Sequence, residues 1–361
     1  MHPETALLHV ISGVGAKGPA CFLLEVAGRR LMLDLGEGPP PGLFPKVDDI
    51  GPIDALVLSH GHRDHVGGLS LLPKLGNPPV YATEIVLRAL PKGIAGRPLP
   101  VRGRGDVLGI AVETGRNGHA PGGIWLRFAI GDGFLYTGDF SAESMLYAYD
   151  PPPPASTALM DCSYGGYDAP LSECWSKLEP FVERGPLLPI PANGRGPEIA
   201  LELLRHGRTD IFVDDAMQKA LRQLCDSAAI SLHDTIGDEV RRLAATVKPI
   251  DDARGIMLAG SADGTSGATA RLFGEWQDKS EPAIVFTGYV NPTTPADRLV
   301  KSGRAQFMRW NVHPRLSDTV ALVRATQAKT VIPAFCDRSQ LAALAAAFAP
   351  AHVTMDGDVA I

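Results

Sequence analysis

The first 160 residues contain short apolar runs separated by turn residues. Short runs of this kind, bounded by glycine, proline and polar clusters, are typical of β-strands. The expected strands are residues 21–26, 30–35, 55–58, 80–82, 107–114, 123–130, 133–136 and 158–160. The expected helices between them are residues 68–75 and 84–90. This part of the chain is therefore expected to be rich in β-structure.

The pattern changes after Gly165-Gly166, where longer amphipathic segments alternate with short apolar runs. The expected helices are residues 171–184, 197–205, 215–228 and 238–246. The expected strands are residues 187–190, 209–213, 255–259 and 284–287, and one further strand is expected at residues 353–361. Alternation of strand and helix favours a parallel sheet that is flanked by helices.

Length and composition describe a globular protein of about two domains. The chain has 361 residues and 45% hydrophobic residues, and we expect neither a signal peptide nor a membrane helix. Its five cysteines are widely spaced and form no CxxC pair, which argues against a disulfide framework and favours the cytoplasm. The formal net charge of −6 opposes nucleic-acid binding unless a local basic patch is present.

Candidate chemistry is concentrated in the segment Ser59-His-Gly-His-Arg-Asp-His65, directly after the apolar run 55–58. Alternate residues leaving a strand share a side, so His60 and His62 are expected to point the same way. Imidazole and carboxylate groups are ligands for zinc, with manganese or iron as alternatives. The competing interpretation is a set of unrelated surface histidines with Asp64 as a helix cap.

Further polar residues complete the candidate site. His119 lies in a predicted turn between strands, and Asp139 follows the run 133–136. Either residue alone is also typical of an ordinary turn. Asp34 follows another apolar run, and we expect it to support the histidine loop by hydrogen bonds and not to bind metal.

The segments LMLDLGEG, SHGHRDHVGG, GHAPGG and YTGDF resemble the successive motifs of the metallo-β-lactamase superfamily, in order and spacing. The resemblance covers about the first 140 residues. It implies an αββα sandwich that binds one metal ion through His60, His62 and His119. It also implies a second ion held by Asp64 and His65, with Asp139 bridging the two and a water of lowered pKa as nucleophile. Asp64 is thereby counted as a catalytic residue as well as a ligand.

The second half of the chain resembles the β-CASP branch of that superfamily, whose members include RNase J, the polyadenylation endonuclease and the Artemis-like nucleases. The resemblance rests on the segments that contain Asp161, Arg195 and His313, together with Phe286-Thr-Gly-Tyr289. It implies that a βα cassette is inserted into the metallo-β-lactamase domain. The expected domains are residues 1–166 with 300–361, and residues 167–299 as the cassette.

Asp161 and His313 resemble the acid and the histidine of two further motifs of the branch. They imply a general-acid pair in which His313 protonates the leaving oxygen and Asp161 orients it. A turn cap and a loop histidine remain the alternatives. Arg195 lies at an expected helix start, where it is a candidate phosphate-binding residue, although a plain surface arginine fits nearly as well.

One segment departs from the branch. Phe335 or Ala334 stands where a metal-binding histidine is expected, and neither side chain is a ligand. The second ion is therefore expected to bind more weakly or to be absent. DNA-acting members of the branch also carry an apolar residue there, so catalysis is not excluded. His352 is a weak candidate substitute.

These observations favour a metal-dependent hydrolase, most of all a nuclease that cleaves single-stranded RNA or DNA with one or two Zn²⁺ ions. Nucleic acid is the expected partner, no membrane is expected, and a homodimer is left open. One alternative is a hydrolase of small thioesters, lactones or nucleotides, which the acidic charge and the missing histidine favour. Another is a non-catalytic homologue that binds nucleic acid.

Overall fold

The computed structural model describes residues 6–250, 255–276 and 278–361. The chain forms two compact units. Unit 1 comprises Met1–Ala142, Ala148–Asp168 and His313–Ile361, and unit 2 comprises Glu143–Tyr147 and Ala169–Val312. The chain thus returns to unit 1 at His313 and not near residue 300, because β17 (Ala305–Phe307) still pairs with a strand of unit 2.

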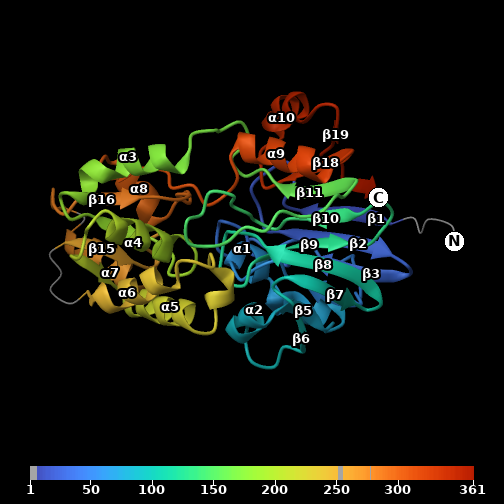
Figure 1. Ribbon diagram of the computed structural model, residues 1–361, viewed down its shortest axis with the longest axis horizontal. Helices are drawn as coiled ribbons and strands as arrows, with labels where there is room; N and C mark the ends of the chain where they lie inside the picture. The colour runs from blue at the N-terminus through green and yellow to red at the C-terminus, as the bar shows by residue number, and fades with distance from the viewer. Residues whose placement is uncertain (1–5, 251–254, 277) are drawn as a thin grey trace. The chain divides into compact units, whose positions relative to one another are not determined.

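Unit 1 contains two sheets (Figure 1). Sheet 1 has the order β20 (Asp358–Ala360), β1 (Leu7–Ser12), β2 (Cys21–Val26), β3 (Arg29–Leu33), β4 (Ala55–Val57), β5 (Val80–Thr83) and β6 (Gly96–Leu99). Sheet 2 has the order β19 (His352–Val353), β18 (Thr330–Ala334), β11 (Thr157–Asp161), β10 (Phe134–Tyr136), β9 (Ile124–Phe128), β8 (Ile110–Arg116) and β7 (Gly103–Val107). The helical segments of unit 1 are α1 (Arg63–Val66), η1 (Leu69–Leu75), α2 (Glu84–Ala89), α9 (Leu316–Thr326), η3 (Arg338–Gln340) and α10 (Leu341–Phe348).

The two sheets face each other across an apolar core. Because successive strand residues point to opposite faces, Phe22 and Leu24 of β2 enter this inner core while Cys21 and Leu23 pack on the outer side. Helices α9 and α10 cover the outer face of sheet 2, and η1 and α2 cover that of sheet 1. The predicted αββα sandwich is confirmed.

Two predicted strands of unit 1 were wrong in extent. Residues 107–114 do not form one strand: Leu108 and Gly109 have φ of 56° and 90° and make the turn of a hairpin between β7 and β8. Positive φ at both central residues is the requirement of a type I′ turn, one of the two-residue turns that favour hairpins. The expected strand 353–361 is also divided, since β19 extends sheet 2 and β20 pairs with β1 in sheet 1.

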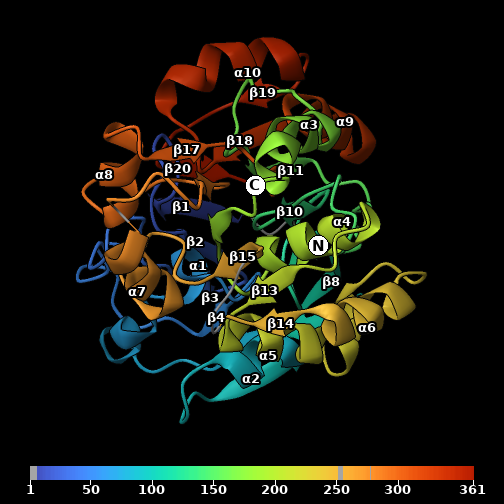
Figure 2. The same ribbon diagram turned by 90° about the vertical axis from the view of Figure 1, so that its left-hand side faces the viewer.

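Unit 2 is built on sheet 3, whose strands are all paired in parallel (Figure 2). Its order is β14 (Lys248–Pro249), β13 (Ile211–Val213), β15 (Ile256–Ala259), β12 (Leu187–Pro189), β16 (Ile284–Phe286) and β17. The helical segments are α3 (Leu171–Val182), α4 (Arg195–Arg205), α5 (Asp215–Cys225), η2 (Ala229–Ser231), α6 (Gly237–Thr246), α7 (Gly267–Trp276) and α8 (Pro295–Lys301). The expected inserted βα cassette is therefore present.

The central strands β12, β15 and β16 of sheet 3 are apolar and buried along their whole length, as expected where both faces of a parallel sheet are covered, whereas the edge strands β14 and β17 contain exposed residues. Leu272 and Phe273 of α7 and Leu299 of α8 pack against Ile284 and Phe286 of β16. Helices α4, α5 and α6 pack on one another. In the described part of the chain, no helix is both long enough and apolar enough to cross a membrane.

Candidate metal centre

The histidine loop begins where β4 ends and leads directly into α1. His60 and His65 are buried, whereas His62 is half-buried and caps α1, with its carbonyl accepting from the backbone N–H of His65 at 2.9 Å. This turn brings the imidazoles together: the ring centroid of His60 lies 4.7 Å from that of His62 and 4.0 Å from that of His65. The strand–loop–helix context thus makes one cluster of all three side chains.

His119 reaches the cluster from the turn between β8 and β9. The side-chain oxygen of Asn117 accepts from the backbone N–H of His119 at 3.1 Å, and Gly118 has a φ of 71° that suits glycine. The turn holds Nε2 of His119 3.0 Å from Nδ1 of His62. A histidine that is distant in sequence therefore joins the loop after β4.

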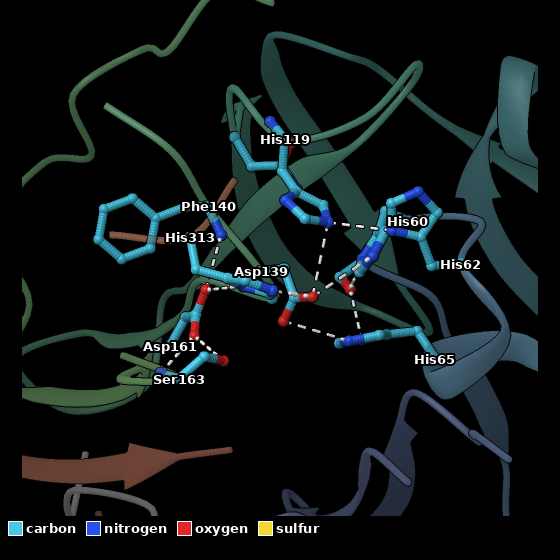
Figure 3. Close-up of polar contacts among 12 residues, drawn as sticks. His60, His62, His65, His119, Asp139, Phe140, Asp161, Ser163 and His313 are labelled. Carbon is cyan, nitrogen blue, oxygen red and sulfur yellow. Dashed lines mark hydrogen bonds and ion pairs between the residues drawn. The ribbon is translucent and has the colours of Figure 1, made fainter. Parts of the chain in front are cut away.

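Asp139 follows β10 and lies among the histidines (Figure 3). Its Oδ1 is 3.2 Å from Nε2 of His65, and its Oδ2 is 3.6 Å from Nε2 of His119 and 3.8 Å from Nε2 of His60. Burial opposes the charge of Asp139, but His65 and His313 outweigh it and hold its pKa well below the ordinary value. Asp139 is therefore an anion.

The donor set fits a divalent metal ion. The described residues form three candidate ligand groups: His60, His62 and His119; His60, His65 and Asp139; and His119, Asp139 and His313. Within each group the donor atoms lie within 4.8 Å of one another. Nitrogen ligands of a tetrahedral zinc ion lie about 3.4 Å apart. Within the described ranges, Nε2 of His60 is buried and has no hydrogen-bond partner, as expected for an atom that is directed at an ion. Burial and the neighbouring histidines hold the pKa of His60 well below its ordinary value, which keeps its lone pair available.

Asp34 holds the histidine loop in place by hydrogen bonds to Ser59 and a contact with His65. Its carboxylate accepts from the backbone N–H and the hydroxyl of Ser59, both at 2.7 Å, and from the hydroxyl of Tyr136. It also lies 2.7 Å from Nδ1 of His65. Burial disfavours charge on His65, but Asp139 and Asp34 outweigh it and raise its pKa well above the ordinary value. Burial, followed by the Asp34 carboxylate, raises the pKa of Tyr136, so its hydroxyl stays protonated.

Asp161 and His313 meet beside Asp139. Nδ1 of His313 lies 2.9 Å from Oδ2 of Asp161 and 3.7 Å from Oδ2 of Asp139. Asp161 is held by hydrogen bonds from the backbone N–H and hydroxyl of Ser163, at 2.9 and 2.6 Å, and from the backbone N–H of Phe140 at 3.2 Å. Burial opposes the charge of His313, but the two carboxylates outweigh it and raise its pKa.

Two candidate residues, Asp64 and Arg195, lie outside these contacts, whereas Phe335 lies beside His65. Among the described residues, Asp64 belongs to none of the candidate ligand groups. Arg195 begins α4 in unit 2, where its guanidinium rests against Gly288: a Cβ at Gly288 would lie 2.0 Å from Nη1. Phe335 follows β18 in unit 1, and its ring centroid lies 5.2 Å from that of His65.

Sequence reasoning did not assign a role to Ser59, Tyr136, Ser163 or Tyr164. Tyr164 presents its ring to His313 at a centroid distance of 5.3 Å. Ser59 and Ser163 each lie within two residues of a candidate acid or histidine, so local spacing carried a signal for them. Tyr136 begins the segment YTGDF, but nothing local indicates its contact with Asp34, which is 102 residues away.

Comparison with known proteins identifies relatives over most of the chain. Residues 14–179 match the family described as the Metallo-beta-lactamase superfamily. The transcription termination factor FttA of Methanosarcina mazei is 25% identical, over 85% of this chain and 61% of its own length. Ribonuclease TTHA0252 of Thermus thermophilus is 28% identical, over 75% of this chain and 76% of its own length. The cleavage and polyadenylation specificity factor 73 of Drosophila melanogaster is 24% identical, over 75% of this chain and 49% of its own length.

A solved structure shows the same fold along the whole chain. It is a protein of unknown function from Enterococcus faecalis V583, with a TM-score of 0.65 at 14% identity, covering 99% of this chain and 100% of that one. Among curated relatives, the chain spans 38% of the length of FttA from Cenarchaeum symbiosum and 61% of that from Methanosarcina mazei.

Proposed function

Because residues 14–179 match the Metallo-beta-lactamase superfamily and the relatives include a ribonuclease and a cleavage and polyadenylation factor, we propose that the protein is a metal-dependent nuclease that cleaves phosphodiester bonds of single-stranded RNA or DNA. The observation that carries the proposal is the convergence of His60, His62, His119 and Asp139 on one centre. Three imidazoles and a carboxylate suit zinc, with manganese or iron as alternatives.

Some residues of the centre are proposed to bind the metal ion, and others are proposed to position those ligands. His60, His62 and His119 hold the ion, and Asp139 contributes negative charge from Oδ2. Activation of water and stabilisation of charge on the phosphoryl oxygens come from a divalent ion when one is bound. Asp34 keeps the histidine loop in place through Ser59.

His313 is the proposed general acid. Nδ1 faces Asp161, which leaves Nε2 as the atom that donates a proton to the leaving oxygen. A raised pKa favours the protonated imidazole that this step needs, and Asp161 and Asp139 are the cause of that shift. Asp161 orients the ring and does not itself transfer the proton.

Arg195 is proposed to bind a backbone phosphate of the substrate. It stands at the first residue of α4, and both a helix N-terminus and a guanidinium favour an anion. The local positive charge matters because the chain as a whole carries a net charge of −6.

All five cysteines are free thiols, and we place the protein in a reducing compartment, the cytoplasm.

The test is hydrolysis of end-labelled single-stranded RNA and DNA by protein loaded with Zn²⁺ or Mn²⁺. We expect cleavage that chelation abolishes and that His62→Ala eliminates together with bound metal. His9→Ala is the matched control, because His9 pairs with Asp358 at 2.7 Å and belongs to no ligand group among the described residues. Hydrolysis of thioesters or lactones without cleavage of nucleic acid would replace the nuclease with a small-molecule hydrolase. Full activity of His62→Ala would contradict the site.

A further inference from the structure

The ligands of a second metal ion are incomplete in this chain. The family resemblance assigns that ion to Asp64, His65, Asp139 and a histidine at the position of Phe335. In the described structure Asp64 joins no candidate ligand group, and it is half-buried on α1. Phenylalanine has no lone pair to offer. Among the described residues, the other members of the candidate ligand groups are His60 and His119, which belong to the first ion, and His313, whose Nδ1 pairs with Asp161. His65 and the shared Asp139 are therefore left for a second ion, fewer than the three protein ligands that a bound zinc ion usually has.

Phe335 also fills space beside His65. Its side chain is 6% exposed, and its ring meets those of His65 and Phe22 edge-on, at centroid distances of 5.2 and 6.2 Å. Its backbone N–H donates to the carbonyl of Gly13 at 2.7 Å, which fixes the segment after β18. A packed aromatic ring therefore lines the side of His65 where the missing ligand would stand.

Both ring nitrogens of His65 lie near carboxylates, Nδ1 in hydrogen-bond contact and Nε2 in an ion-pair contact. Nδ1 lies 2.7 Å from Oδ2 of Asp34, and Nε2 lies 3.2 Å from Oδ1 of Asp139. Because His65 contacts Oδ1 of Asp139, the other carboxylate oxygen, Oδ2, faces His60 and His119. His65 is thus placed to orient Asp139 toward the first ion.

From these contacts we propose that the chain binds a single divalent ion, at His60, His62 and His119 with Asp139, and that His65 is a positioning residue for Asp139 and not a ligand. This inference rests on the proposed metal-dependent function. It specifies how many ions that function uses and which histidine acts through another side chain.

The first experiment counts metal ions by elemental analysis, after saturation with Zn²⁺ and removal of excess. We expect one equivalent for the wild-type protein, two for Phe335→His and one for the matched control Phe335→Leu. Histidine is among the residues that adopt positive φ more readily, and Phe335 has a φ of 63°, so the backbone favours this substitution. Circular dichroism verifies that each variant is folded.

The second experiment measures metal affinity by competition with a chelator and does not need Phe335 to be replaced. We expect His65→Ala to retain one equivalent at saturation but to bind it about 10–100-fold more weakly, as for other residues that orient a ligand. His65→Gln should recover most of that loss, because its amide N–H can donate to Asp139. The absorption spectrum of bound Co²⁺ should be unchanged in His65→Gln, because the ligands are the same.

The outcomes separate this inference from the proposed function. Absence of bound metal in the wild-type protein would overturn both. Two equivalents in the wild type would overturn the single-ion inference and leave the nuclease proposal standing. A folded Phe335→His protein with one equivalent would contradict the assignment of that position. Complete loss of metal from His65→Ala, or an altered Co²⁺ spectrum in His65→Gln, would make His65 a ligand.

Discussion

Glu198 gives unit 2 a stability that depends on pH. It lies in the first turn of α4 with 2% of its surface exposed, and its carboxyl oxygens accept from the backbone N–H of Met145 and from Nε1 of Trp310, each at 3.2 Å. Burial is the main cause that raises the pKa of Glu198 from 4.5 to about 7. Near neutral pH this carboxyl group therefore still holds a proton in a large part of the folded molecules.

The direction of the effect follows from proton linkage. Between pH 4.5 and about 7 the folded protein keeps a proton on Glu198 that the unfolded chain has released. The free energy of unfolding therefore falls as the pH rises through this window. A pKa difference of about 2.5 units corresponds to about 3 kcal/mol, present below pH 4.5 and lost above about 7.

The perturbation is Glu198→Gln, whose amide stays neutral at every pH. We expect the variant to lose about 3 kcal/mol of the pH dependence shown by the wild-type protein. Its baseline stability should also fall, by about 1–3 kcal/mol, because one of the two N–H donors now faces the amide nitrogen. The assay is urea unfolding at about pH 5 and about pH 8, followed by tryptophan fluorescence, since Trp310 contacts Glu198 directly.

Two comparisons isolate Glu198. His65 and His313 have raised pKa values, so they also stabilise the folded state. That stabilisation is complete below the ordinary histidine pKa and is lost as the pH rises through the raised pKa, so it has the same sign as the effect of Glu198. The wild-type protein and the Glu198→Gln variant share this contribution, and it cancels in their comparison. Glu173→Gln, at an exposed position of α3, is the matched control and should keep the wild-type slope, because Glu173 is not among the groups that shift the pKa of Glu198. Equal pH slopes in wild type and Glu198→Gln would refute the reasoning.

Three further predictions concern unit 1. His313→Ala should slow cleavage and leave the metal content unchanged in elemental analysis; a loss of metal would show that His313 is a ligand. Gly118→Ala should weaken zinc affinity in a chelator competition, because a Cβ there would lie 2.1 Å from the carbonyl oxygen of Ser141 and would displace the turn that carries His119. Gly131→Ala, which also has positive φ but faces open space, should bind zinc normally; equal losses in both would point to general instability. Asp34→Asn should weaken metal binding about 10–100-fold, and an unchanged affinity would remove Asp34 from the support of the loop.

Much of the fold could be predicted because short sequence patterns determine where its strands and helices form. The βα alternation after Gly166 indicated the parallel sheet of unit 2, and the motifs around His60 indicated the sandwich of unit 1. The division of the terminal segment between β19 and β20 could not be predicted, because strand partners are chosen by contacts that are distant in sequence. The hairpin turn at Leu108 was hidden within a continuous apolar pattern.

In the candidate site, too, contacts between residues close in sequence could be predicted from spacing, whereas contacts between distant residues could not. His60, His62 and His65 come together through one turn, so their spacing alone suggested a cluster. Asp161 and His313 lie 152 residues apart, and their pairing was suggested by resemblance and not by spacing. The role inferred for Phe335 depends on its packing against His65, which no sequence pattern reveals.

The two ends of the cassette join neighbouring strands. Strands β11 and β18 are parallel and adjacent, with Asp161 opposite Ala334, although all of Ala169–Val312 lies between them in sequence. Asp161 precedes the cassette and His313 follows it immediately, so a folded cassette holds the ends of a very long loop together and removes most of the entropy of closing it. Local unfolding of unit 2 would therefore release the proposed proton donor while the histidines of the N-terminal segment stay assembled.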